Sequence, residues 1–230
     1  MITRRRDYSK KAPSKDARKI YIICEGEGSE PDYFRFFEGL SSNLQLIVIP
    51  PDAGTDPLKL KMQSERLFSG DSPKYTIDYL QRDMVWFVID TDTWEREGKI
   101  ALLRDFCKSN NDHFPKEYDE VKPYQAWNVA QSNPCFEIWL YYHIYSDLPS
   151  TDEASRHKTF KEFVSAVIAG GFDYQRDPAR IDDAISNAAS NFERQSNGNP
   201  ALYSTEVYRL GEEICRFVKR QIDILRGKMA

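Results

Sequence analysis

The run MVWFVID at residues 84–90 constrains the fold more than any other segment, because it is apolar up to its last residue. A strand without polar alternation is typical of a sheet that is covered on both faces. Three further strand patterns and a helical pattern after each strand can be assigned. The strands are expected at 19–24, 44–50 and 127–132, and the helices at 29–39, 57–68, 95–109 and 134–145. This alternation predicts an α/β fold with a mostly parallel sheet flanked by helices. Ser29 is the expected cap of the first helix.

The strand signal disappears after about Tyr145, and the remainder reads as helical. Amphipathic patterns predict helices at 155–170, 178–194 and 204–225. We therefore expect a flexible basic leader at 1–18, an α/β domain at 19–146, and a helical extension at 147–230. The extension is expected to pack on the sheet, because neither of its linkers is long.

Charge and composition bear on the binding partners and the cellular compartment of the protein. Residues 1–19 carry a net charge of +6, whereas the whole chain carries −4. A basic leader suits an arm that touches nucleic acid, and a solvated terminus without a partner explains it equally well. The four cysteines are scattered without zinc-ligand spacing and fit reduced thiols. No apolar run approaches the roughly 20 residues of a membrane span. We expect a cytoplasmic protein without membrane contact.

Acidic residues follow two of the predicted strands at the points where these strands end. Glu25 and Glu30 frame the turn after the first strand, and Asp90 and Asp92 close the central one. Ligands bind beyond the carboxyl ends of parallel strands, so these side chains are expected to meet at one exposed edge. Gly26 would let the backbone pass close to a metal or its ligand.

A cluster of carboxylates repels itself unless a cation or protons neutralise it. Oxygen donors suit Mg²⁺ or Mn²⁺, so Glu25, Asp90 and Asp92 predict part of a metal site that water and phosphate oxygens complete. Such a metal would polarise a phosphoryl oxygen and help to generate hydroxide. Each motif alone is weak, since an isolated DxD is usually structural. The joint pattern carries the prediction.

Polar residues also follow the strand expected at 127–132. Ser132 and Asn133 lie outside any nucleophile elbow, and either helix capping or substrate positioning would explain them. Glu137 lies one turn into the next helix, where it would act as a metal ligand or base, or only favour the helix dipole. His143 lies on the same aromatic helix and is expected to be a hydrogen-bonded core residue.

Four segments together resemble the RloB family of prokaryotic defence proteins. They are IYIICEGEGSEPDYF, VWFVIDTDTW, WNVAQSNPCFEIWLYYHI and STEVYRLGEEI, and the Ser-Asn-Pro-x-x-Glu-x-Trp segment is the most specific. The resemblance runs from Lys19 through the last helix and implies a Toprim-like domain, as in topoisomerases, primases and overcoming-lysogenization-defect nucleases. By this resemblance, Glu25 matches the Toprim Glu, and Asp90 and Asp92 match its DxD pair. Glu30 takes the place of a further acidic residue in related nucleases.

The resemblance also implies partners and an activity. RloB-like genes lie beside RloA, an AAA-type ATPase, which implies an ATPase partner and an antiphage role. We expect a metal-dependent nuclease that binds DNA or RNA, and a homo-oligomer is compatible with the sequence. The residues expected to be catalytic are Glu25, Glu30, Asp90 and Asp92. The residues expected to position the substrate are Gly26, Ser132, Asn133 and Glu137.

Two alternative functions remain open from the sequence. The first is a catalytically silent subunit that binds nucleic acid or a phage product for an ATPase complex. The second is a metal-dependent nucleotidyl or glycosyl transferase, because a strand-terminal DxD also suits a nucleoside diphosphate held through a metal.

Overall fold

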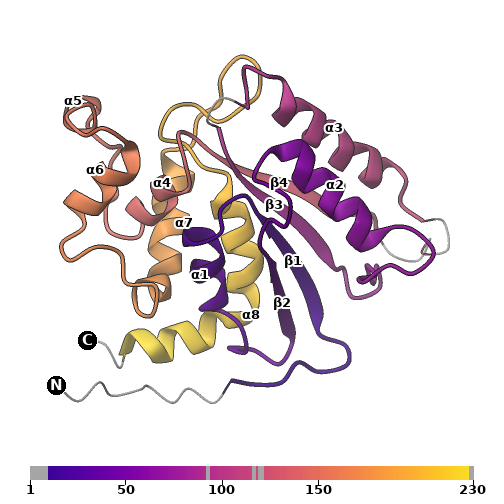
Figure 1. Cartoon of the computed structure of the whole chain (residues 1–230). Coiled ribbons are helices and arrows are strands. Elements are labelled where there is room, and N and C mark those ends of the chain that lie inside the picture. The colour runs from indigo at the N-terminus through magenta and orange to yellow at the C-terminus, as the bar shows by residue number, and fades with distance from the viewer. Residues whose placement is uncertain (1–9, 92–93, 116–117, 119–121, 228–230) are drawn as a thin grey trace.

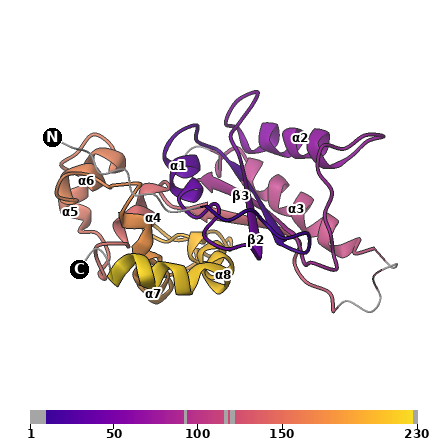
Figure 2. The ribbon, with the colours of Figure 1, turned by 90° about the horizontal axis from the view of Figure 1, so that it is seen from below.

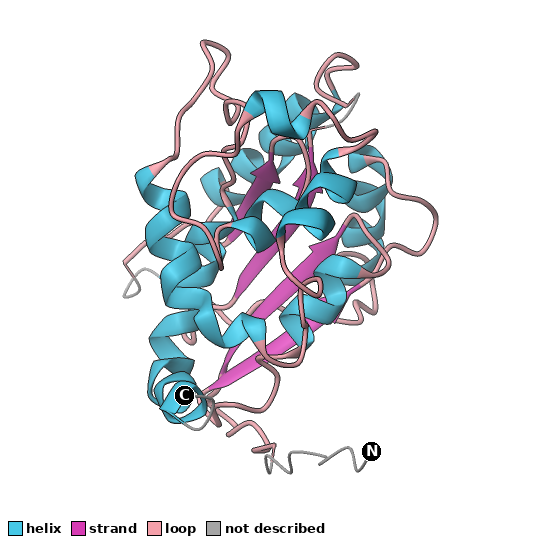
Figure 3. Ribbon diagram, turned by 90° about the vertical axis from the view of Figure 1, so that its left-hand side faces the viewer, coloured by secondary structure: helices cyan, strands magenta, loops and turns pink. Residues whose placement is uncertain are grey.

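A single parallel sheet organises the chain. The computed structural model describes residues 10–91, 94–115, 118 and 122–227. Its strands are β1 (Arg18–Cys24), β2 (Leu44–Ile49), β3 (Met84–Asp90) and β4 (Trp127–Ser132), in the order β2–β1–β3–β4. Every pairing is parallel, so the arrows in Figure 3 point the same way. The predicted α/β fold with a mostly parallel sheet flanked by helices is confirmed.

Two helices cover one face of the sheet. Side chains alternate along a strand, so β1 and β3 each contribute to a core on both faces. Tyr21, Ile23, Val85, Phe87 and Ile89 form the first core with α2 (Pro57–Phe68) and α3 (Lys99–Asp112). Figure 2 shows these two helices on the side opposite α1, α7 and α8.

The second face carries the larger core. Ile20, Ile22, Trp86 and Val88 pack there against helices from both halves of the chain. The helical elements outside the first face are α1 (Ser29–Arg35), α4 (Glu137–Tyr141), α5 (Thr151–Ala154), α6 (Phe160–Val167), η2 (Asp177–Arg180), α7 (Ile181–Ser190) and α8 (Val207–Gly227). Figure 1 shows α5 and α6 beyond α4, away from α3. None of the helices in the described ranges is long and apolar enough to cross a membrane.

Several helices differ from the sequence-based expectation. The cap of α1 is Gly28, whose position makes no side-chain capping bond, and Ser29 is already helical, so the predicted Ser29 cap is wrong. The helix expected at 134–145 is shorter, because tight turns flank it: the Ile138 N–H donates to the Cys135 carbonyl and the His143 N–H to the Leu140 carbonyl. Its aromatic residues are buried all round, so hydrophobic periodicity could not mark where the helix ends.

The segment from Tyr203 to Glu206 runs antiparallel beside the end of β4. The Tyr203 N–H donates to the Asn133 carbonyl, the Asn133 N–H donates to the Ser204 carbonyl, and an isolated bridge joins Ser132 to Thr205. The C-terminal part of the chain therefore completes the carboxyl edge of the sheet. The domain boundaries expected at 18 and 146 stay predictions.

Candidate functional site

Carboxylates meet at the carboxyl ends of β1 and β3. Glu25, Glu30, Asp90 and Glu137 are 5–7% exposed, and we call these four residues the acidic cluster. The expectation that they lie on an exposed edge is wrong, because α1, α4 and α6 close over the strand ends. Asp92, the second acid of the predicted DxD pair, lies outside the described residues.

Glu25 links the ends of the two central strands. Its Oε2 accepts a hydrogen bond of 2.8 Å from the Asp90 N–H, and its Oε1 accepts one of 2.7 Å from the Trp94 indole N–H. Both carboxylate oxygens therefore accept hydrogen bonds from neutral donors. Carboxylate oxygens are also the ligands that a hard cation prefers.

Asp90 is held at the centre of the acidic cluster. Its Oδ1 accepts a hydrogen bond of 2.8 Å from the Phe136 N–H, which fixes the carboxylate against the start of α4. Burial raises the pKa of Asp90 well above its ordinary value, and the charges of Glu30 and Glu25 raise it further. This carboxyl therefore favours a proton or a bound cation over an uncompensated charge.

Gly26 makes room for the Glu30 carboxylate. A Cβ at position 26 would lie 2.1 Å from Glu30 Oε2, so no other residue fits the observed arrangement. The expected close backbone approach is thus made toward Glu30. Burial raises the pKa of Glu30, and hydrogen bonds from the Glu30 and Gly26 backbone oppose this without cancelling it.

Lys161 on α6 supplies a positive charge to the acidic cluster. Its Nζ lies 3.7 Å from Glu137 Oε1 and 4.0 Å from Asp90 Oδ2. Burial lowers the pKa of Lys161, but the charges of Glu137 and Asp90 outweigh burial and raise it overall. Sequence analysis missed this residue, because a lysine on an amphipathic helix far along the chain carries no signal of its own.

Glu137 keeps one oxygen free of protein donors. Among the described residues, Glu137 Oε2 is buried without a hydrogen-bond partner, while Oε1 lies 3.5 Å from Ser29 Oγ. A buried acceptor without a donor is unusual in a folded protein and calls for an ion, a water or a ligand group.

The described residues of the site fit a hard cation in chemistry. All four members of the acidic cluster offer oxygen donors, which Mg²⁺ and Mn²⁺ prefer. No group of three or more His, Cys, Asp or Glu residues within the described ranges is arranged to hold a metal ion. Metal ligation by Glu25, Asp90 and Asp92 stays a prediction.

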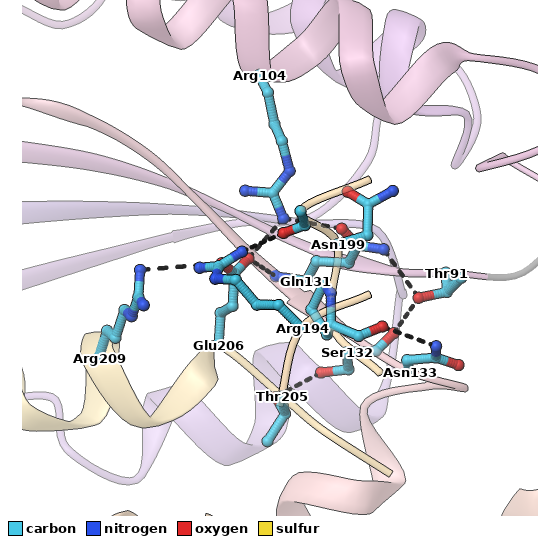
Figure 4. A network of polar contacts seen from close by, with 12 residues as sticks. Thr91, Arg104, Gln131, Ser132, Asn133, Arg194, Asn199, Thr205, Glu206 and Arg209 are labelled. Carbon is cyan, nitrogen blue, oxygen red and sulfur yellow. Dashed lines mark hydrogen bonds and ion pairs between the residues drawn. The ribbon is translucent and has the colours of Figure 1, made fainter. Parts of the chain in front are cut away.

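Ser132 and Asn133 face the C-terminal segment. Ser132 Oγ lies 2.8 Å from Thr205 Oγ1, and Asn133 Nδ2 donates to the Pro200 carbonyl at 3.0 Å (Figure 4). Ser132 is fully buried, so its hydroxyl is engaged in holding this segment on β4. Their expected role in positioning a substrate stays a prediction.

A second buried carboxylate, Glu206, is surrounded by arginines. Its side chain lies 2.6 Å from Arg104, 2.7 Å from Arg194 and 3.9 Å from Arg209. Arg104 also donates to Gln131 Oε1, so the arrangement ties α3, β4 and α8 together (Figure 4). We call these five residues the Glu206 network; its members are far apart in sequence, and sequence analysis missed it.

His143 is a core residue, as expected. It is fully buried, with Nδ1 2.9 Å from the Trp139 carbonyl and Nε2 3.1 Å from the Tyr33 hydroxyl. Burial lowers the pKa of His143 to about 3, which keeps the ring neutral. It has no contact with the acidic cluster that would suggest ligation.

Comparison with known proteins gives one match. A family model described as RloB-like protein matches residues 20–214. No curated protein and no solved structure matches the chain.

Proposed function

The chain belongs to the RloB-like family, and we propose that it is a divalent-metal-dependent nuclease of prokaryotic antiphage defence. The observation that carries this proposal is the burial of four carboxylates, Asp90 among them, at the carboxyl edge of the sheet. Burying like charges together costs free energy. A reaction that depends on a bound cation would explain why the fold keeps these carboxylates together. The family membership supports the defence role, and the resemblance supports the Toprim-like interpretation.

In this proposal, Glu25, Asp90 and Asp92 would hold Mg²⁺ or Mn²⁺, which would supply polarisation of the scissile phosphate. The hydrogen bonds from Phe136 to Asp90, and from Trp94 to Glu25, preorient the carboxylates. This reduces the reorganisation that binding requires.

Glu30 is the candidate general base. Burial raises its pKa, and a base works best when its pKa lies closer to the working pH. Its carboxylate would orient the attacking water and accept the proton. Glu137, whose Oε1 lies 3.7 Å from Lys161 Nζ, would position the substrate.

Partners follow from the family and from the proposed chemistry. The substrate would be DNA or RNA, and an RloA-like AAA-type ATPase would gate or deliver it. The basic residues near the N-terminus, including Lys10, Lys11 and Lys15, would add affinity for phosphates.

The catalytically silent binding subunit is the second candidate. The raised pKa of Asp90 supports it, because burial and the neighbouring carboxylates favour a proton on this side chain. In that case the acidic cluster would take up protons rather than a metal, and nucleic-acid binding would persist in a chelator.

The deciding experiment is cleavage of end-labelled DNA and RNA by the purified protein in Mn²⁺, with and without the ATPase. The nuclease hypothesis predicts metal-dependent cleavage that falls at least about a hundredfold in Asp90→Asn. The matched control is Asp105→Asn, an exposed acid on α3, which should cleave like the wild type. If the wild type did not cleave either nucleic acid even with the ATPase present, the catalytically silent binding subunit would be the better hypothesis.

A further inference from the structure

A small pocket opens beside the acidic cluster, among α1, α4, α6 and the chain that follows α6. Its volume is about 190 Å³. Its lining combines three aliphatic side chains with Ser29, Glu137, Lys161, Ser165, Phe172 and Tyr174. We call it the side pocket. It is smaller than the roughly 300–1,000 Å³ typical of drug-sized ligands, so it suits a single ring system.

A buried carboxylate, that of Glu137, belongs to the lining of the side pocket. Glu137 is 7% exposed, and its Oε2 has no hydrogen-bond partner among the described residues. The other oxygen, Oε1, lies 3.5 Å from Ser29 Oγ and 3.7 Å from Lys161 Nζ. A ligand with an N–H or NH₂ group at this position would satisfy the acceptor.

The walls of the side pocket are apolar and partly aromatic. The Phe172 and Tyr174 rings lie 5.2 Å apart at 67°, and Phe172 also packs edge-on against the buried His143 ring. These contacts hold the aromatic wall in place. A preformed aromatic wall favours a flat ring, because stacking then needs little reordering.

Two residues connect the side pocket to the proposed reaction centre. Glu137 and Lys161 line the pocket and also belong to the charged contacts around Asp90, which Lys161 approaches at 4.0 Å. The Lys161 side chain is 59% exposed, so it can reach a phosphate next to a bound ring. The ring site and the phosphate site are therefore neighbours.

We propose that the side pocket binds one unpaired nucleobase of the substrate, and that it favours a base with an exocyclic amino group. Glu137 accepts the hydrogen bond from this amino group, and Lys161 contacts the adjacent phosphate. The inference rests on the proposed function for its substrate class, although base binding itself needs no metal. It makes single-stranded or locally unpaired nucleic acid the substrate, because a paired base cannot enter a pocket.

The preference for an amino group follows from the charge of Glu137. Adenine and cytosine present an NH₂ donor on the Watson–Crick edge. Thymine and uracil present one ring N–H between two carbonyl oxygens, and those oxygens face a carboxylate unfavourably. Oligo-dT is therefore the matched negative probe for oligo-dA and oligo-dC.

The test measures anisotropy of fluorescein-labelled oligo-dA, oligo-dC and oligo-dT of about ten nucleotides in EDTA. Wild type should bind oligo-dA and oligo-dC about tenfold more tightly than oligo-dT, and more tightly than a blunt duplex. Ser165→Trp, which fills the side pocket from an exposed helical position, should weaken oligo-dA binding by about tenfold. Ala166→Trp, exposed on the same helix and outside the pocket lining, should bind like the wild type.

A second variant tests the role of the acceptor. Glu137→Gln should lose the preference for oligo-dA over oligo-dT, because its amide can donate as well as accept. Three outcomes would overturn the proposal. Ser165→Trp could bind oligo-dA as tightly as the wild type does, the wild type could bind all three oligonucleotides equally, or it could bind none of them. These outcomes are independent of cleavage in Mn²⁺, so pocket binding without cleavage would reject only the nuclease.

Discussion

The acidic cluster and the Glu206 network are both built on buried carboxylates, yet their charge balance is opposite. In the acidic cluster, four carboxylates including Asp90 are accompanied by the Lys161 ammonium, which approaches no closer than 3.7 Å. Around Glu206, one carboxylate faces three guanidinium groups, two of them within 2.7 Å. Burial alone therefore does not mark a carboxylate as functional. The two regions differ in how far neighbouring positive charges compensate the buried carboxylates.

The contrast separates a cluster of like charges from an ion-pair network that holds elements together. The acidic cluster gains by taking up protons or a metal, because burial and the neighbouring carboxylates raise the pKa of Asp90 and of Glu30. The Glu206 network already has its partners and joins segments that are far apart in the chain. Four perturbations should affect the two regions differently.

The largest effect is expected from Glu206→Gln. Removing this charge leaves Arg104 and Arg194 without their buried partner, and we expect a loss of about 3 kcal/mol in the free energy of unfolding. Urea denaturation measures it. Glu193→Gln, at an exposed position, is the control and should change stability by less than about 0.5 kcal/mol. If the urea midpoint of Glu206→Gln equalled that of the wild type, the Glu206 network would not stabilise the fold, and the difference between the two regions would not hold.

Metal should stabilise through the acidic cluster alone. With Mn²⁺ at about a hundred times its dissociation constant, wild type should gain about 2.7 kcal/mol over the same protein in EDTA. Glu206→Gln should keep this increment, and Asp90→Asn should lose it. If Asp90→Asn gained as much as the wild type, the cation would have to bind elsewhere. Urea denaturation with and without the metal gives all three values.

In EDTA, Asp90→Asn should be more stable than the wild type at pH about 8, by roughly 0.5–2 kcal/mol. Folding raises the pKa of Asp90, so wild-type stability falls as pH rises through the folded-state value. The asparagine Oδ1 still accepts from the Phe136 N–H but carries no charge. The gain should vanish near pH about 4, close to the ordinary pKa of Asp. A severe loss of stability in the variant would instead make Asp90 structural.

The smallest effect is expected at the rim of the Glu206 network. Arg209 lies 3.9 Å from Glu206 and is 44% exposed, so Arg209→Ala should cost less than about 1 kcal/mol. Arg104→Ala should cost more, because Arg104 bonds to both Gln131 and Glu206. Thermal unfolding of the two variants ranks them, and the reverse order would show that the ion pairs of the network do not follow their geometry.

Local sequence patterns sufficed for the strands. The apolar run at 84–90 gave the bounds of β3, because a strand buried on both faces differs from its surroundings at each end. Patterns were less informative for α4, where Trp139 and Tyr142 are buried although only part of the segment is helical. Burial on every side removes the periodicity that distinguishes a helix from a series of turns.

The site was predictable as far as the strand-end rule extends. That rule placed Glu25 and Asp90 together, and the structure brings them within one hydrogen bond. It could not give the burial of the site or the arrival of Lys161, since both depend on how α6 packs. The sequence suggested capping or substrate positioning for Ser132. It could not reveal the contact with Thr205, which is 73 residues away. Long-range contacts of this kind leave no local signal.

The segment from Tyr203 to Glu206 has a consequence for how the protein behaves in storage. β4 is the last strand of the sheet, and this segment occupies the backbone groups at its carboxyl end. An uncovered strand edge is a template for pairing with other chains. Detachment of the segment would therefore expose an adhesive edge before the cores on either side of the sheet open. Variants that loosen it should fail by self-association, and the rate of that failure should rise with protein concentration.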